Sequence, residues 1–321
     1  MQNVRNARDL KGLWAAVPTP WDDGGRFDAA TLERNVERYA GIPMDGVYTT
    51  DSDGEFYAIE LDEFKRVTGV FAKAMDRTDM AVAAGVTWCN TQGIIDRMRV
   101  CLDNGILCFH VAYPFWMPLS PTDVSRFWED LASAVPQGRW VHYNTPRAGL
   151  LMKGKDYSWI AESHPEQLVG VKMGTVDVVA MAECITGAPQ GDPGAAGAAP
   201  SLAHLGTDYV TVYAMMLGAV GVCSYWANTL PRWTRRMMDL CLAKKWDEAR
   251  HMQNRLLEWE TLHIAAWREA GHLHGIIGKA RASLSGWLEE NRVSRAPYYP
   301  VDDALFAKVK AEFDRFWAGE S

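Results

Sequence analysis

Paired cysteines are missing from this sequence. Its 321 residues include six cysteines, which lie far apart and form no Cys-x-x-Cys pair. They are Cys89, Cys101, Cys108, Cys184, Cys223 and Cys241. This spacing gives no indication of a disulfide framework or of a thiolate cage for a metal ion. We therefore expect buried free thiols.

Excess positive charge and long apolar runs are also missing. The formal net charge is −7, whereas a nucleic-acid or anionic-membrane partner requires a basic face. No segment approaches the ~18 consecutive apolar residues of a membrane helix. The N-terminus carries no basic region followed by an apolar stretch. We expect a soluble, cytoplasmic protein without nucleic-acid or membrane partners.

The sequence does contain a regular alternation of short apolar runs and longer helix-like segments. The apolar runs cover residues 12–17, 46–48, 80–84, 106–112, 140–143, 168–172, 201–205 and 219–224. The helix-like segments cover 29–39, 61–75, 93–103, 122–134, 157–162, 178–186, 209–217 and 233–243. Eight such units are the number that closes an α/β fold of the (β/α)8 TIM barrel type. We assign residues 1–243 to this barrel and expect it to carry the active site.

Residues 244–321 follow a wholly helical pattern. Candidate helices cover 247–270, 277–290 and 302–317, and no strand accompanies them. We expect a C-terminal helical extension that caps the barrel or forms an oligomer surface. Its apolar positions Leu256, Leu257, Trp259 and Leu262 favour a homo-oligomer. Within the barrel, the Gly-, Ala- and Pro-rich segment 187–200 predicts an extended loop without a phosphate-binding glycine motif.

Lys172 is the residue that most requires an explanation. It ends the run 168–172, which is too short for a helix and typical of a parallel strand covered on both faces. An ammonium group is costly there, and desolvation lowers a lysine pKa, so that the neutral amine can form a Schiff base with a carbonyl. The alternative is that Lys172 lies at the exposed end of the strand and points into water.

Three other predicted strands end in residues that suit a site, at the barrel end where active sites are built. Residues 49–56 carry hydroxyls, carboxylates and a glycine, which suit a substrate carboxylate or an ordinary capping turn. Tyr143-Asn144-Thr145-Pro146 places a phenol beside a fixed turn, although a tyrosine there is often only a packed aromatic. The small residues at 218–224 let a ligand approach the backbone, or allow tight barrel packing.

Taken together, these segments resemble the dihydrodipicolinate synthase / N-acetylneuraminate lyase family. Ala16-Val17-Pro18-Thr19-Pro20 is similar to the Thr-Pro of the family's first strand, and Gly54-Glu55 to the end of its Gly-Thr-Thr-Gly-Glu motif. Tyr143-Asn144-Thr145-Pro146 resembles its Tyr-Asn-x-Pro, and Gly170-Val171-Lys172 resembles its Gly-x-Lys. The resemblance covers residues 12–230 and implies a Schiff-base class I aldolase on a TIM barrel.

The resemblance also implies a role for each matching residue. Lys172 forms the imine, and Tyr143 carries protons during imine formation and carbon–carbon bond making or breaking. Ser52 and Asp53 hold the carboxylate of the 2-oxo acid. The remaining substrate-binding candidates are Trp116, Arg147, Gly206 and Val222. No cofactor is expected, and no metal, because His272 and His274 have no third ligand motif beside them.

Three positions depart from the family pattern. Asp53 replaces a hydroxyl with a carboxylate, which repels a substrate carboxylate unless it is protonated or turned away. Phe115-Trp116 lacks the tyrosine hydroxyl that completes the synthase's proton relay, and Arg147 lies one residue nearer to the Pro than the synthase's arginine. We therefore expect an enzyme other than a true dihydrodipicolinate synthase, with an indole that packs against an apolar or aromatic acceptor.

The sequence thus predicts a lyase that joins Lys172 to pyruvate or a related 2-oxo acid. It catalyses aldol cleavage or condensation, with an aldehyde as a second partner, and the resemblance implies a homotetramer. Dehydration of a 2-oxo-3-deoxy sugar acid is an alternative reaction. An alternative of another class is a catalytically silent barrel that binds a 2-oxo acid.

Overall fold

Eight parallel strands close into a barrel in this computed structural model, which describes residues 1–189 and 202–320. They are β2 (Gly12–Ala16), β3 (Gly46–Thr49), β4 (Ala81–Gly85), β5 (Cys108–Val111), β6 (Arg139–Asn144), β7 (Leu168–Met173), β8 (Ala203–Thr207) and β9 (Gly221–Ser224). Each pairs with the next along the chain, and β2 pairs with β9 to close the ring. A two-residue strand, β1 (Gln2–Asn3), adds to β4. The predicted TIM barrel is confirmed.

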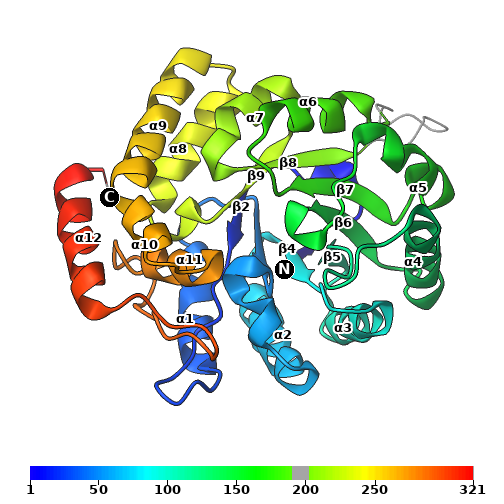
Figure 1. The fold of residues 1–321 in the computed structure, drawn as a ribbon, viewed down its shortest axis with the longest axis horizontal. Coiled ribbons are helices and arrows are strands. Elements are labelled where there is room, and N and C mark those ends of the chain that lie inside the picture. The colour runs from blue at the N-terminus through cyan, green and yellow to red at the C-terminus, as the bar shows by residue number, and fades with distance from the viewer. Residues whose placement is uncertain (190–201, 321) are drawn as a thin grey trace.

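Helices follow the strands and surround the barrel (Figure 1). They are α1 (Ala29–Tyr39), α2 (Leu61–Met75), α3 (Thr91–Asp103), α4 (Pro121–Ala134), α5 (Ser158–Ser163), α6 (Val178–Gly187), α7 (Thr211–Leu217) and α8 (Pro231–Leu242). Capping side chains help to set where they begin: Asp28 accepts the N–H of Thr31, and Ser120 accepts that of Asp123. From residue 190 onward, the predicted loop at 187–200 lies outside the described residues.

Apolar side chains fill two layers around the strands. Trp14, Tyr48, Val141 and Leu205 belong to the cluster inside the barrel, and a larger cluster lies between the strands and the helices. The inner layer is tight, because a Cβ added at Gly46 would lie 2.4 Å from the indole of Trp14. The barrel is therefore a packed core, and substrates can bind only at its ends.

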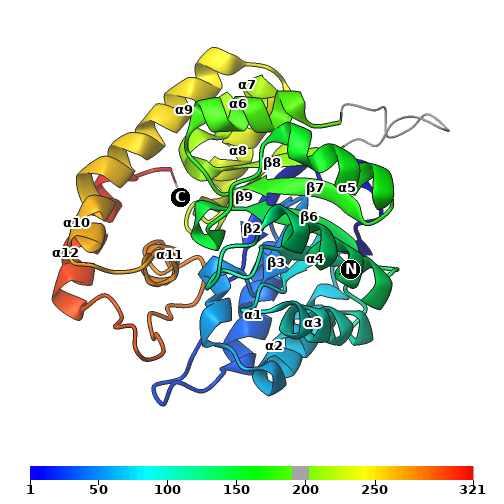
Figure 2. The same ribbon diagram turned by 45° about the vertical axis from the view of Figure 1, so that its right-hand side comes forward.

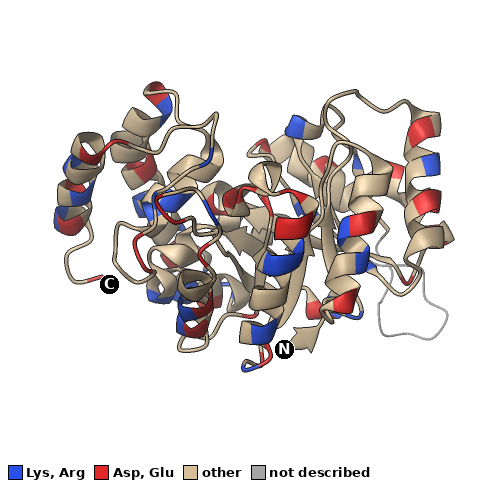
Figure 3. Cartoon of the chain, turned by 90° about the horizontal axis from the view of Figure 1, so that it is seen from below, with Lys and Arg blue, Asp and Glu red and all other residues tan. Residues whose placement is uncertain are grey.

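The surface carries both signs of charge. In the view of Figure 3, Lys and Arg alternate with Asp and Glu along the helices. No helix in the described part of the chain is long and apolar enough to cross a membrane. All six cysteines are free and five are buried, but Cys89 is exposed. The prediction of a buried thiol is therefore wrong for Cys89.

The C-terminal extension differs from the predicted helices in two places. It contains α9 (Trp246–Trp259), α10 (Ala265–Glu269), α11 (His274–Ala282) and α12 (Asp303–Phe316). The predicted helix 247–270 is divided by a π-helical segment, Glu260–Ile264. The predicted helix 277–290 is wrong at both ends: it begins at His274, and it ends before Gly286, whose φ is +69°.

The extension packs on one side of the barrel, with α11 nearest to the strands (Figures 1 and 2). A separate apolar cluster joins Trp226 and Trp233 to Trp259, Trp267 and Trp317. Leu256 and Trp259, which we expected at an oligomer surface, are therefore fully buried inside the chain. Leu262 is 62% exposed. The homotetramer stays a prediction that now has less apolar surface to support it.

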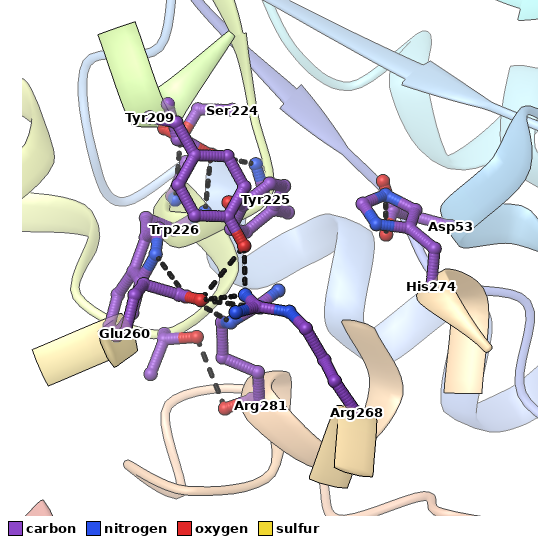
Figure 4. Close-up of polar contacts among 12 residues, drawn as sticks. Asp53, Tyr209, Ser224, Tyr225, Trp226, Glu260, Arg268, His274 and Arg281 are labelled. Carbon is purple, nitrogen blue, oxygen red and sulfur yellow. Dashed lines mark hydrogen bonds and ion pairs between the residues drawn. The ribbon is translucent and has the colours of Figure 1, made fainter. Parts of the chain in front are cut away.

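A buried carboxylate fastens the extension to the barrel. Glu260, in the π-helical segment, accepts hydrogen bonds from the indole of Trp226 (3.0 Å) and the hydroxyl of Tyr209 (2.9 Å). It pairs with Arg281 of α11 at 3.0 Å and with Arg268 of α10 at 2.5 Å. Figure 4 shows these groups converging on its carboxylate. Glu260 therefore links two loops at the barrel end to two helices of the extension.

We expect Glu260→Ala to lower the free energy of unfolding by about 3–5 kcal/mol, because it leaves the buried guanidinium of Arg281 without its partner. Urea denaturation measures this loss. Glu258→Gln, on the exposed side of α9, is the control and should change stability by less than about 0.5 kcal/mol. A loss below about 1 kcal/mol in Glu260→Ala would contradict this role for the carboxylate.

Candidate active site

Lys172 lies near the C-terminal end of β7, beside Tyr143 of the neighbouring strand β6. The side chain is buried, with 7% of the residue exposed. Its ammonium nitrogen lies over two aromatic rings, 4.1 Å from the centre of Tyr143 and 4.5 Å from that of Tyr48. The alternative of a lysine that points into water is therefore wrong.

The phenol that approaches the amine is not the predicted one. Lys172 Nζ donates to the hydroxyl of Tyr48 at 3.3 Å, whereas Tyr143 presents the face of its ring. Tyr48 comes from β3, and burial raises its pKa well above the ordinary value. Its hydroxyl is therefore a poor acid in the resting site. Tyr143 lines the adjoining cavity instead.

Asp51 is the group closest to the amine. One carboxylate oxygen lies 2.6 Å from Lys172 Nζ and 2.9 Å from Nδ1 of His110 on β5. Burial alone would raise the pKa of Asp51, but Lys172 and His110 lower it to about 2. Burial alone would also lower the pKa of Lys172, but Asp51 outweighs it and raises the pKa above the ordinary value. The prediction of a lysine with a lowered pKa is therefore wrong for the resting protein.

A strained turn carries Asp51 into this position. The preceding residue, Thr50, has φ of +55°, which is rare for a β-branched residue and costs about 1–3 kcal/mol. Its hydroxyl donates to the carbonyl of Gly85 at 2.9 Å. A Cβ at Gly85 would lie 2.3 Å from the carbonyl oxygen of Thr50, so only glycine lets β4 approach the turn so closely. The surrounding barrel thus holds the turn in its strained form.

Ser52 and Asp53 follow Asp51 but face different groups. Ser52 lines the cavity. Asp53 is buried and lies 3.5 Å from Nε2 of His274 on α11, as Figure 4 shows. Burial raises the pKa of Asp53, but His274, Lys172 and Arg281 together more than offset this and the net pKa is lowered. Asp53 is thus an anion turned towards the extension, which answers the objection that it would repel a substrate carboxylate.

A cavity of about 330 Å³, a volume within the usual range for small-molecule sites, is lined by Tyr143, whose ring Lys172 contacts. Six aromatic side chains line it: Phe56, Tyr57, Tyr113, Phe115, Tyr143 and Tyr298. Arg147 contributes a guanidinium to the wall, and Leu273, His274 and Gly275 of the extension contribute another part. The cavity thus combines an aromatic interior with one cation that can meet an anionic substrate.

The structure places three predicted binding residues away from this cavity. Trp116 is 81% exposed, and its neighbour Phe115 lines the cavity instead. The expected indole contact is therefore corrected to a phenyl contact. Gly206 and Val222 pair on β8 and β9. A Cβ at Gly206 would lie 2.8 Å from Ala214 of α7, and the side chain of Val222 packs in the outer core.

Sequence reasoning missed Asp51, His110 and the part of the cavity made by the extension. Counting back from Gly54-Glu55, Asp51 stands where the Gly-Thr-Thr-Gly-Glu motif begins with glycine. That difference could have identified Asp51 as a site residue. A histidine inside the apolar run 106–112 could have identified His110 in the same way. No comparable signal predicts Tyr298, which reaches the cavity only through tertiary packing. The described residues hold no group of three His, Cys, Asp or Glu side chains suited to a metal ion.

Comparisons with known proteins agree with this fold. A family model described as the dihydrodipicolinate synthetase family matches residues 9–315. A 4-hydroxy-tetrahydrodipicolinate synthase from Pelobacter propionicus is 28% identical over 94% of this chain and 97% of its own length. A trans-O-hydroxybenzylidenepyruvate hydratase-aldolase from Pseudomonas aeruginosa is 25% identical over 44% of each chain.

Solved structures also match over nearly the whole length. A prophage protein of the dihydrodipicolinic acid synthase family from E. coli K12, solved in complex with pyruvate, superposes with a TM-score of 0.83. It is 19% identical and covers 96% of this chain and 98% of its own. At that identity the likeness concerns the fold alone.

We expect Lys172→Met to make stability depend on pH. In the wild type, the lowered pKa of Asp51 gives stability that is present above the ordinary 3.8 and is lost only as pH falls through about 2. The raised pKa of Lys172 gives stability that is lost only as pH rises through that pKa. Both groups therefore stay charged between pH 5 and 8.

In the variant, the ammonium no longer offsets burial and His110 alone still lowers the pKa of Asp51, so we expect this pKa to rise above its ordinary value and stability to fall as pH rises through it. We expect the free energy of unfolding to be lower than that of wild type by about 3–5 kcal/mol at pH 8, and by less at pH 5. Urea denaturation at the two pH values measures this difference. In Lys172→Met/Asp51→Asn, the deficit should be equal at both pH values. An equal deficit in the single variant would contradict this coupling.

Proposed function

This chain belongs to the dihydrodipicolinate synthetase family, whose members are lyases of the class I aldolase type, and we propose that its Lys172 forms a Schiff base with pyruvate or a related 2-oxo acid. The observation that carries the proposal is a buried lysine at the C-terminal end of a barrel strand, against a tyrosine that lines a cavity. Catalytic groups of TIM barrels lie at this end.

The proposed reaction uses the amine as a covalent catalyst. The neutral amine of Lys172 attacks the keto carbon, water departs, and a protonated imine remains. That imine draws electrons from the neighbouring carbon, so a carbon–carbon bond to an aldehyde can form or break. Ser52 and Arg147 both line the cavity wall, which supports assigning them to the substrate's carboxylate and oxygen atoms. Tyr143 adjoins both the cavity and the amine.

The cavity favours an aromatic or apolar aldehyde as the second partner. Phe56, Tyr57, Phe115 and Tyr298 offer ring faces and edges, and an aromatic contact contributes about 0.5–1.5 kcal/mol beyond area burial. Aspartate semialdehyde is the acceptor of the synthase named in the family. Its charged groups would lose hydration if they were buried among these rings. The name of one relative's substrate joins a hydroxybenzylidene group to pyruvate, which fits the same preference. We therefore propose an aldolase for an aromatic aldehyde and pyruvate.

Borohydride reduction in the presence of pyruvate should attach a stable adduct to Lys172. We expect the adduct in buffer containing EDTA, because the imine supplies the electron sink without a metal ion. Peptide mass mapping locates it, and Lys172→Ala should not form it. An adduct on Lys279, the other deeply buried lysine of the described chain, would refute the assignment.

Condensation of pyruvate with benzaldehyde-type acceptors should be more efficient than with aspartate semialdehyde. Phe115→Ala should lower kcat/KM for the aromatic acceptor by about three- to tenfold, which corresponds to about one aromatic contact. Met117→Ala is the control, since Met117 is exposed and lies two residues away. Steady-state kinetics of pyruvate consumption provide the measurement. A wild-type preference for aspartate semialdehyde would overturn the proposed acceptor class.

A further inference from the structure

Asp51 contacts the proposed reactive nitrogen, but it has no role in the reaction described above. Its carboxylate touches the nitrogen of Lys172, the atom that would become the imine nitrogen. Among the described residues, Asp51 and Tyr48 place oxygen atoms within hydrogen-bond reach of that nitrogen. Tyr48 is the weaker proton carrier of the two, because burial makes its hydroxyl a poor acid.

A structural role alone does not account for this ion pair. A buried pair usually contributes little net stability compared with apolar side chains of the same size, because both charges lose their hydration. The turn that presents Asp51 is also strained at Thr50. The neighbouring strands supply apolar residues to the barrel interior, so the fold does not require a charge here. Costs of this kind are typical of functional sites.

We propose that Asp51 is the acid–base residue of the site, which takes a proton from the ammonium of Lys172 and returns it to the oxygen that leaves as water. The proposal rests on the Schiff-base chemistry proposed above. It assigns a catalytic role to a residue that stands at a glycine position of the family motif quoted for Gly54-Glu55.

The proton transfers balance as follows. The ammonium of Lys172 gives one proton to Asp51, and the neutral amine forms a bond to the keto carbon while the carbonyl electron pair moves to oxygen. A proton passes from the new nitrogen to that oxygen and produces a hydroxyl. The protonated Asp51 gives its proton to the hydroxyl, the carbon–oxygen bond breaks, and water leaves. The products are a protonated imine and the Asp51 carboxylate, which again face each other as a charge pair.

His110 positions Asp51 for this exchange. Its Nδ1 contacts the same carboxylate oxygen as Lys172, at 2.9 Å, and burial lowers the pKa of His110 so that the ring is neutral. A neutral ring with a proton on Nδ1 donates to Asp51 and holds the oxygen near the amine. The other titratable groups around the pair are Tyr48 on β3, Asp53 in the turn after β3, Tyr143 on β6 and Cys223 on β9.

The test compares the rate of imine formation, followed by rapid borohydride quench with pyruvate and mapped to Lys172, between pH 5.5 and 9.5. We expect Asp51→Asn to lower the maximal rate constant about 100-fold, the lower end of the usual range for general acid–base catalysis. We also expect the midpoint of the profile, which the raised pKa of Lys172 puts above this range in wild type, to move to lower pH, because the carboxylate that most strongly opposes the effect of burial on Lys172 is then gone. Asp45→Asn is the matched control, since Asp45 pairs with Arg235 and immediately precedes β3, at the opposite end of the barrel.

A second pair of variants tests the proposal even if Asp51→Asn fails to fold. Asp51→Glu keeps the acid and Asp51→Gln does not, and the two side chains have the same size. We expect Asp51→Glu to form the imine at least tenfold faster than Asp51→Gln. His110→Phe should slow imine formation on Lys172, because it removes the hydrogen bond that holds the Asp51 oxygen beside the amine. His110→Asn, whose amide can still donate to Asp51, should recover at least part of that rate, and equal rates for the two variants would refute the positioning role.

The outcomes separate this proposal from the one on which it rests. If wild type forms no adduct on Lys172, the Schiff-base function fails. If wild type forms the adduct and Asp51→Asn reaches a maximal rate within threefold of it, the assignment of Asp51 alone is overturned. Equal rates for Asp51→Glu and Asp51→Gln would also overturn it.

Discussion

The contact between the Lys172 ammonium and the Asp51 carboxylate, 2.6 Å apart and cut off from solvent, is the interaction on which the proposed site depends. Neither charge is stable alone at this depth, because burial opposes the charged form of both. Together they stay ionised and store a reactive amine in an unreactive form. Before the amine can react with a substrate carbonyl, the ammonium must lose a proton to a nearby group. The side chains around the pair meet this requirement.

The surroundings keep the pair both dry and aligned. Rings of Tyr48 and Tyr143 cover the nitrogen, and His110 contacts the same carboxylate oxygen as Lys172. The strained Thr50 and the glycine at position 85 let two strands meet closely enough to aim Asp51 inward. The site is thus assembled from side chains of β3, β5, β6 and β7, each placed by the register of a closed sheet.

Much of this arrangement was predictable from the sequence, because βα units carry a strong periodic signal. A single lysine in an apolar run predicted the centre of the proposed site, and the short motifs around it identified the family. Partners of that lysine were not predictable in the same way. A strand pattern does not say which ring presents its face and which its hydroxyl, so Tyr143 was chosen over Tyr48. The sequence also does not say which of the neighbours Phe115 and Trp116 turns towards the cavity, because tertiary packing decides this.

The backbone of α11 closely approaches the barrel at Gly275 and Gly278. A side chain at Gly275 would collide with the backbone of Ser52, and one at Gly278 with the carboxylate of Asp53. The helix therefore rests directly on the turn that follows Asp51, while its N-terminal residues form part of the cavity wall. The extension thus builds one wall of the cavity, with Leu273, His274, Gly275 and Tyr298, while the barrel supplies Lys172 and the other aromatic rings. Substitutions in residues 244–321 can therefore reshape that wall while the groups around Lys172 stay as they are.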